Sequence, residues 1–70
     1  MNDATKTIHA RDSIKHAVVL LEEVDRNSLY EYHGDLWPEY WETLLILRRA
    51  LFRANKLSDS LEKNMEANNG

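Results

Sequence analysis

The residues of this 70-residue chain that first suggest chemistry are two histidines near its start. His9, Asp12 and His16 are three and four residues apart, and imidazole and carboxylate groups are ligands that zinc and other transition metals accept. On a helix, however, the two histidines lie two turns apart, roughly 10 Å, and Asp12 is rotated away from the line joining them. A polar outer helix face is the favoured interpretation, so we expect no metal and no other cofactor.

A line of basic residues in the second half of the chain suggests a different chemistry. Arg49, Arg53 and Lys56 recur on one side of a predicted helix, and such a line is what phosphate neutralisation requires. The chain as a whole is acidic, with a net charge of −3, and has neither a basic arm nor the turn signal of a helix-turn-helix motif. A small dimeric DNA-binding transcriptional regulator using this face is therefore the alternative function and not the preferred one.

Catalytic patterns are weaker still. The chain has no cysteine, and its two glycines do not form a phosphate-binding loop. No Ser/His/Asp set falls where one helix pair would bring it together, and two helices offer little concavity for a substrate. We expect the protein not to be an enzyme.

Three polar residues, Asp25, Arg48 and Asn55, occupy positions where the hydrophobic pattern predicts apolar residues. If the chain turns near His33–Leu36, Asp25 lies opposite Arg48, and our hypothesis is an ion pair between them with Glu22 as the substitute acceptor. Such a pair would fix the register of two helices more than it would stabilise them. Asn55 resembles the single buried asparagine that sets register in coiled coils. The alternative is that Arg48 reaches the surface and Asn55 lies at a rim.

Aromatic residues crowd around the predicted turn. Tyr30 and Trp37 are expected to be exposed, as candidate anchors for a partner, since Trp and Tyr are frequent interface anchors. Tyr40 and Trp41 are equally well explained as the end of the core. Seven acidic residues but only one basic residue, Arg26, fall between positions 22 and 42. An acidic, aromatic tip would fit a basic, apolar groove on another protein, and a merely solvated end is the other interpretation.

These residues are positioned by a helix predicted over about 37–65, with Pro38 in its first turn. Its main apolar seam alternates steps of four and three residues. The seam consists of Tyr40, Leu44, Leu47, Leu51, Ala54, Ser58 and Leu61, with Asn55 beside it. A second stripe of Trp41, Leu45 and Phe52 widens the apolar arc beyond what one neighbouring helix covers.

A first helix is predicted over about 12–32. It packs through one face, which holds Ile14, Ala17, Val18, Leu21 and Val24. Gly34 follows its end, and a tight connection makes the two helices antiparallel neighbours. Residues 1–10 are expected to be flexible and residues 66–70 disordered, within a single helical domain spanning 1–70. No run of residues approaches the length of a membrane span or forms a signal peptide.

The pattern therefore predicts an all-α protein, an antiparallel two-helix hairpin that dimerises into a four-helix bundle. A compact chain of this length would have a radius of gyration near 11 Å, whereas a helix from Pro38 to about Met65 is roughly 40 Å long and overhangs it. We expect a homodimer in the cytoplasm. The expected function is non-enzymatic protein binding, as a small adaptor or inhibitor that modulates a larger protein, such as a host modulator encoded by a phage or plasmid.

Overall fold

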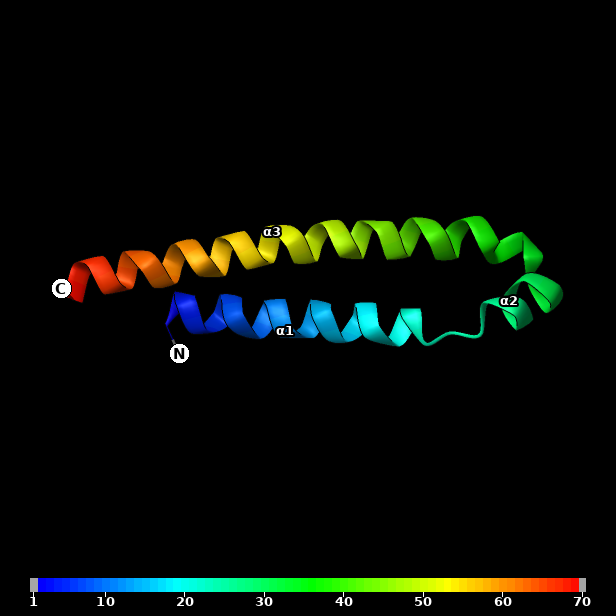
Figure 1. Ribbon diagram of the computed structural model, residues 1–70, viewed down its shortest axis with the longest axis horizontal. Coiled ribbons are helices and arrows are strands. Elements are labelled where there is room, and N and C mark those ends of the chain that lie inside the picture. The colour runs from blue at the N-terminus through cyan, green and yellow to red at the C-terminus, as the bar shows by residue number, and fades with distance from the viewer. Residues whose placement is uncertain (1, 70) are drawn as a thin grey trace.

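The protein is all-α, as predicted, and elongated. The computed structural model describes the backbone of residues 2–69 and the side chains of residues 2–64. The element order is α1 (Asp3–Glu22), α2 (Arg26–Tyr32), the short 3-10 helix η1 (Gly34–Leu36) and α3 (Trp37–Asn69). α1 and α3 lie side by side and antiparallel, with α2 and η1 connecting them at one end (Figure 1). The radius of gyration is 16.4 Å, well above the value of about 11 Å for a compact chain of this length.

The start of α1 corrects the prediction of a flexible segment over residues 1–10. Asn2 is the N-cap, and its side-chain oxygen accepts a hydrogen bond from the backbone N–H of Thr5 at 2.8 Å. Ala4 is buried, and Thr7 and Arg11 follow it at steps of three and four on the face that meets α3. The helix therefore begins about nine residues earlier than predicted, because small and polar residues continue its packing face.

The predicted first helix is also divided, which corrects the prediction of one helix over 12–32. α1 ends at Glu22, and Asp25 starts α2 as its N-cap. The Asp25 carboxylate accepts hydrogen bonds from the Ser28 backbone N–H at 3.2 Å and from the Ser28 hydroxyl at 2.9 Å. This cap satisfies N–H groups that a helix end leaves unpaired, so it favours a new helix start over a continuous helix.

α3 begins as predicted, with Pro38 in its first turn, but extends further than predicted. Its backbone is helical to Asn69, beyond the end predicted near residue 65 and into the segment 66–70 that we predicted to be disordered, and Gly70 lies outside the described residues. Glu66 and Ala67 are good helix formers, and no proline interrupts the chain after Pro38. Among the described residues, no helix is long and apolar enough to cross a membrane.

The core is a narrow strip between α1 and α3. Val18, Tyr40 and Leu44 are its buried residues, and Leu44 is fully inaccessible to solvent. Partly buried side chains surround these three, namely Ile14, Leu21, Leu29, Trp41, Leu47 and Leu51. The strip follows steps of three and four on both helices, which is the spacing of a coiled-coil seam. Val24, which we expected on the packing face, is exposed instead because α1 ends before it.

Candidate binding surfaces

The turn end of the molecule carries a connected set of aromatic rings. Trp37 lies at its centre: its ring centroid is 5.5 Å from that of Tyr30, 6.0 Å from that of Tyr40 and 5.6 Å from that of Trp41. Tyr40 and Trp41 are 5.3 Å apart and nearly perpendicular. These spacings are in the range of favourable aromatic pairs. The rings that we weighed separately as anchors and as core therefore form one cluster.

Two polar contacts fix this cluster to the rest of the chain. The Tyr40 hydroxyl donates a hydrogen bond of 2.7 Å to the backbone carbonyl of Leu21, near the end of α1. Arg26, from α2, donates through Nε to the same hydroxyl at 3.2 Å, and its guanidinium lies 5.1 Å from the centroid of the Trp41 ring. Because one tyrosine hydroxyl connects α1, α2 and α3, the turn end is held to the seam.

Part of the turn end remains open to solvent. Tyr30 is 64% exposed, whereas Trp37 and Trp41 are only half-buried. Tyr32 and Leu36 are also exposed. Carboxylates from α2, η1 and the first turns of α3 are exposed beside these side chains, namely Glu31, Asp35, Glu39 and Glu42. The turn end therefore presents exposed aromatic rings beside negatively charged side chains.

The predicted ion pair of Asp25 with Arg48 is wrong. Arg48 Nη2 instead lies 3.1 Å from Glu22 Oε1, the acceptor that we named as its substitute, and both side chains are nearly half exposed. Asp25 is used as the α2 cap. Its hydrogen bond from the Ser28 backbone N–H, reinforced by that from the Ser28 hydroxyl, lowers the pKa of its carboxyl below the usual value. The helix cap competes for the carboxylate that the pairing hypothesis assigned to Arg48.

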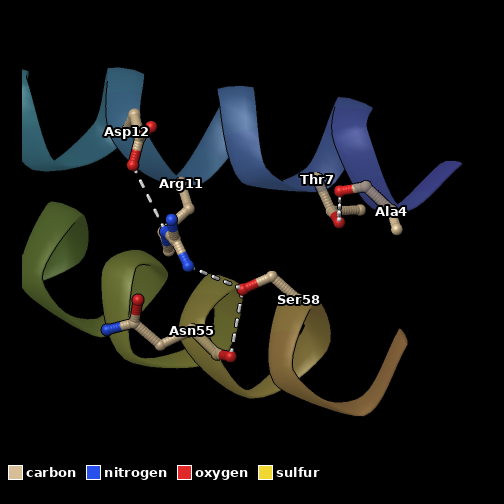
Figure 2. A network of polar contacts seen from close by, with 6 residues as sticks. All are labelled: Ala4, Thr7, Arg11, Asp12, Asn55 and Ser58. Atoms are coloured by element: carbon tan, nitrogen blue, oxygen red, sulfur yellow. Dashed lines mark hydrogen bonds and ion pairs between the residues drawn. The ribbon is translucent and has the colours of Figure 1, made fainter. Parts of the chain in front are cut away.

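The open end of the seam holds a polar layer, shown in Figure 2. Arg11 Nη1 donates to Ser58 Oγ at 3.3 Å, and the same hydroxyl donates to the backbone carbonyl of Asn55 at 3.3 Å. Ser58 is fully buried, whereas the Asn55 side chain is exposed. Within the chain, the exposure of Asn55 fits the alternative of a rim position and not that of a buried register residue, since it lies one step outside the seam position of Ala54. Sequence reasoning also missed Arg11, which lies on the α1 face in step with Ile14 and Val18.

One flank of α3 carries the predicted side stripe beyond Trp41. Leu45 and Phe52 are each 60% exposed. The Lys56 ammonium lies 4.8 Å from the centroid of the Phe52 ring, within the range of a cation–π contact. Arg49 and Arg53 are exposed on the side of α3 away from α1. Lys56, one of the three residues of the predicted basic face, therefore also contacts the apolar stripe.

The opposite flank of α3 holds a stripe that sequence reasoning missed. Ile46 is 59% exposed and Leu57 is 52% exposed, with the half-buried Ala50 between them at helical spacing. At about 100° per residue, these three fall on the other side of the seam from Leu45 and Phe52. The four-residue run from Leu44 to Leu47 contained the signal, since it places an apolar residue on every side of the helix.

His9, Asp12 and His16 are not gathered into one cluster. Within the described part of the chain, no three histidine or acidic side chains gather as metal ligands would. Asp12 is instead 3.3 Å from Arg11 Nε. Comparisons of the chain with known protein families, with curated proteins and with solved structures found no match.

Proposed function

We propose that this chain is a cytoplasmic, non-enzymatic protein-binding module, an adaptor or inhibitor that modulates a larger protein and acts as a homodimeric four-helix bundle. The observation that carries the proposal is the exposure of large apolar side chains on both flanks of α3, Leu45 and Phe52 on one and Ile46 and Leu57 on the other. Large apolar side chains that recur along an exposed helix face are typical of interaction sites in folded proteins.

The total surface supports a dimer. The chain exposes 5535 Å², whereas a compact monomer of its 8.2 kDa mass would expose about 4,500 Å². The excess of about 1,000 Å² is comparable to the roughly 800 Å² that each partner buries in a stable interface. A second copy would cover one flank and leave the other available.

The larger partner is proposed to bind at the turn end and the adjoining side stripe. Tyr30 and Trp37 supply aromatic surface there, and Trp41, Leu45 and Phe52 extend it along α3. The exposed carboxylates around the turn would steer a basic surface toward these rings and would set specificity more than affinity. The partner surface that fits is an apolar groove with a basic rim.

Affinity capture with matched variants tests this function. The wild-type chain and an Arg49→Ala control, altered on the outer face of α3, are expected to retain the same single protein in stoichiometric amount. Phe52→Ala and Tyr30→Ala are expected to lose it, because each removes an exposed anchor without touching the buried seam. Capture that is indifferent to both anchors would contradict the proposed surface.

The nucleic-acid alternative has its own test. A salt-sensitive mobility shift with random duplex DNA, weakened by Arg49→Ala and Arg53→Ala but not by Phe52→Ala, would support DNA binding as the function in place of protein binding. Each lost phosphate contact lowers the slope of affinity against salt concentration by about one. Under our proposal the chain gives no such shift at physiological salt.

A further inference from the structure

The flank of α3 that carries Ile46, Ala50 and Leu57, here called the small-residue flank, differs from the Leu45/Phe52 flank in what surrounds it. We infer that the small-residue flank is the self-association face. We further infer that the second copy packs on it in the reversed direction, with α3 against α3 and α1 against α1. This inference rests on the dimer in the proposed function and specifies its face and orientation.

Charge distinguishes the two flanks. Beside Leu45 and Phe52 lie the Glu22–Arg48 ion pair and the Lys56 ammonium, so a second copy there would have to cover charged groups. On the small-residue flank, Thr43, Ile46, Ala50 and Leu57 are uncharged, and the one charged position at this spacing between them is Arg53, at the outer margin beside Ile46. Homodimer interfaces are the more apolar class of protein interface, so the second copy is expected on the less charged flank.

Small side chains let two helix pairs approach at this flank. Arg11 contacts Ser58, and Glu22 pairs with Arg48. These two contacts define which residues of α1 and α3 lie at the same level along the helix pair. By this register Ala17 of α1 lies within one helical turn of the level of Ala50, and both are half-buried. A small layer flanked by the larger Ile46 and Leu57 allows the shorter interaxial distances of packed helices.

The distribution of charge along the molecule selects the orientation. Residues 22–42 contain seven acidic residues and one arginine, a net charge of −6, so the rest of the chain carries +3 of the total of −3. Two copies in the same direction would place both acidic turn ends together. In the reversed direction the two acidic turn ends lie at opposite ends of the dimer, which is the arrangement with less repulsion between them.

Cysteine crosslinking of the purified protein tests the face and the orientation together, because the natural chain has no cysteine. In the reversed arrangement Ala50 lies near the twofold axis, close to its own counterpart. Ala50→Cys is therefore expected to form a disulfide-linked dimer on mild oxidation, as is a mixture of Ile46→Cys with Leu57→Cys. The matched control, Leu45→Cys on the other flank, is expected to stay uncrosslinked.

Two results would overturn the inference. Crosslinking through Leu45→Cys and not through Ala50→Cys would move the interface to the Leu45/Phe52 flank. Crosslinking of Ala17→Cys with Ala50→Cys, but not of Ala50→Cys with itself, would show copies running in the same direction, since α1 then faces α3. Circular dichroism of each variant checks that the helices are retained. No partner protein is used, so these results are distinguishable from a failure of the proposed partner binding.

Discussion

Both flanks of α3 expose large apolar side chains, but the flanks differ in composition. Leu45 and Phe52 on one flank have the same exposure, within a few per cent, as Ile46 on the other. The first flank has an ion pair and a lysine beside its apolar residues, and it continues into the aromatic turn end. The small-residue flank has alanine and threonine instead. The two exposed flanks therefore suit two different occupants.

This difference indicates how a short chain can form a dimer and still bind a partner. A less charged face with small residues suits a permanent contact with an identical copy, whereas a face with an ion pair, a lysine and aromatic anchors suits a partner that is bound and released. Both faces depend on the seam between α1 and α3, because that seam fixes the rotation of α3.

The largest effect is expected from Leu44→Ala. Leu44 is fully buried in the seam, and its truncation should cost about 2–5 kcal/mol of folding free energy. Because the core is so small, we expect the helix pair to unfold as a whole, so that self-association and partner binding through the two flanks are both lost. Urea unfolding followed by circular dichroism measures the loss. The control is Leu45→Ala, one residue away and exposed, and an equal loss in both variants would contradict the described rotation of α3.

Ile46→Asp and Leu45→Asp should separate the flanks. A symmetric dimer buries an introduced carboxylate twice, so Ile46→Asp should raise the dimer dissociation constant on the order of 100-fold. Leu45→Asp should leave the dimer intact and remove partner capture. Sedimentation equilibrium of the two variants measures self-association. If Leu45→Asp alone dissociated the dimer, the assignment of the flanks would be reversed.

A smaller effect is expected at the polar layer. Ser58→Ala removes the buried hydroxyl that accepts from Arg11 and donates to the Asn55 carbonyl, at a cost of about 1 kcal/mol. The exposed Ser60, altered to alanine, is the matched control and should change stability by less. Thermal unfolding measures both. An unchanged midpoint for Ser58→Ala would show that the layer does not contribute to pairing of α1 with α3.

Asp25→Ala should act locally, by fraying α2. The folded-state pKa of Asp25 is depressed, so its cap contributes stability above the unfolded-state pKa and loses it as the pH falls through the folded-state value, below 3.8. Amide hydrogen exchange of Ser28 and Leu29 should therefore quicken in the variant at neutral pH. In the wild type, the protection of these amides, corrected for the intrinsic pH dependence of exchange, should be lost only in strong acid. Asp35→Ala, in η1, is the control and should leave exchange in α2 unchanged.

The smallest effect is expected from Glu22→Gln. The ion pair with Arg48 is nearly half exposed, so solvent screening limits it to at most about 1 kcal/mol. A double-mutant cycle with Arg48→Gln measures the coupling between the two side chains. A larger coupling, unaffected by salt, would mean that this pair sets the register in the way we first assigned to Asp25.

Helix type and the α3 seam could be predicted from the sequence because both depend on apolar spacing. Tyr40, Leu44 and Ser58 lie where the alternation of four and three residues places them, and all three are buried. The start of α1 and its division from α2 could not be found this way. They depend on the Asn2 and Asp25 caps, which are single polar contacts within otherwise helical patterns.

The binding surfaces were harder to predict than the helices. The aromatic residues near the turn were recognised, but their grouping into one cluster depends on Arg26 and the Tyr40 hydroxyl. The partner of Arg48 was also hard to predict, because it depends on which acidic residue caps α2. Asp25 is that cap, so Glu22 pairs with Arg48. Ile46 and Leu57 were overlooked because a helix with apolar residues on every side shows no separate stripe until one side is seen to pack.

The most direct test of the central claim, that the chain is a dimer with one flank of α3 left free, is its mass in solution. Light scattering during size-exclusion chromatography would follow the mass across a dilution series from high to low micromolar. The account predicts about twice the 8.2 kDa chain mass at the upper end of the series. A mass of one chain at every concentration would contradict it, and both flanks would then be open to other proteins.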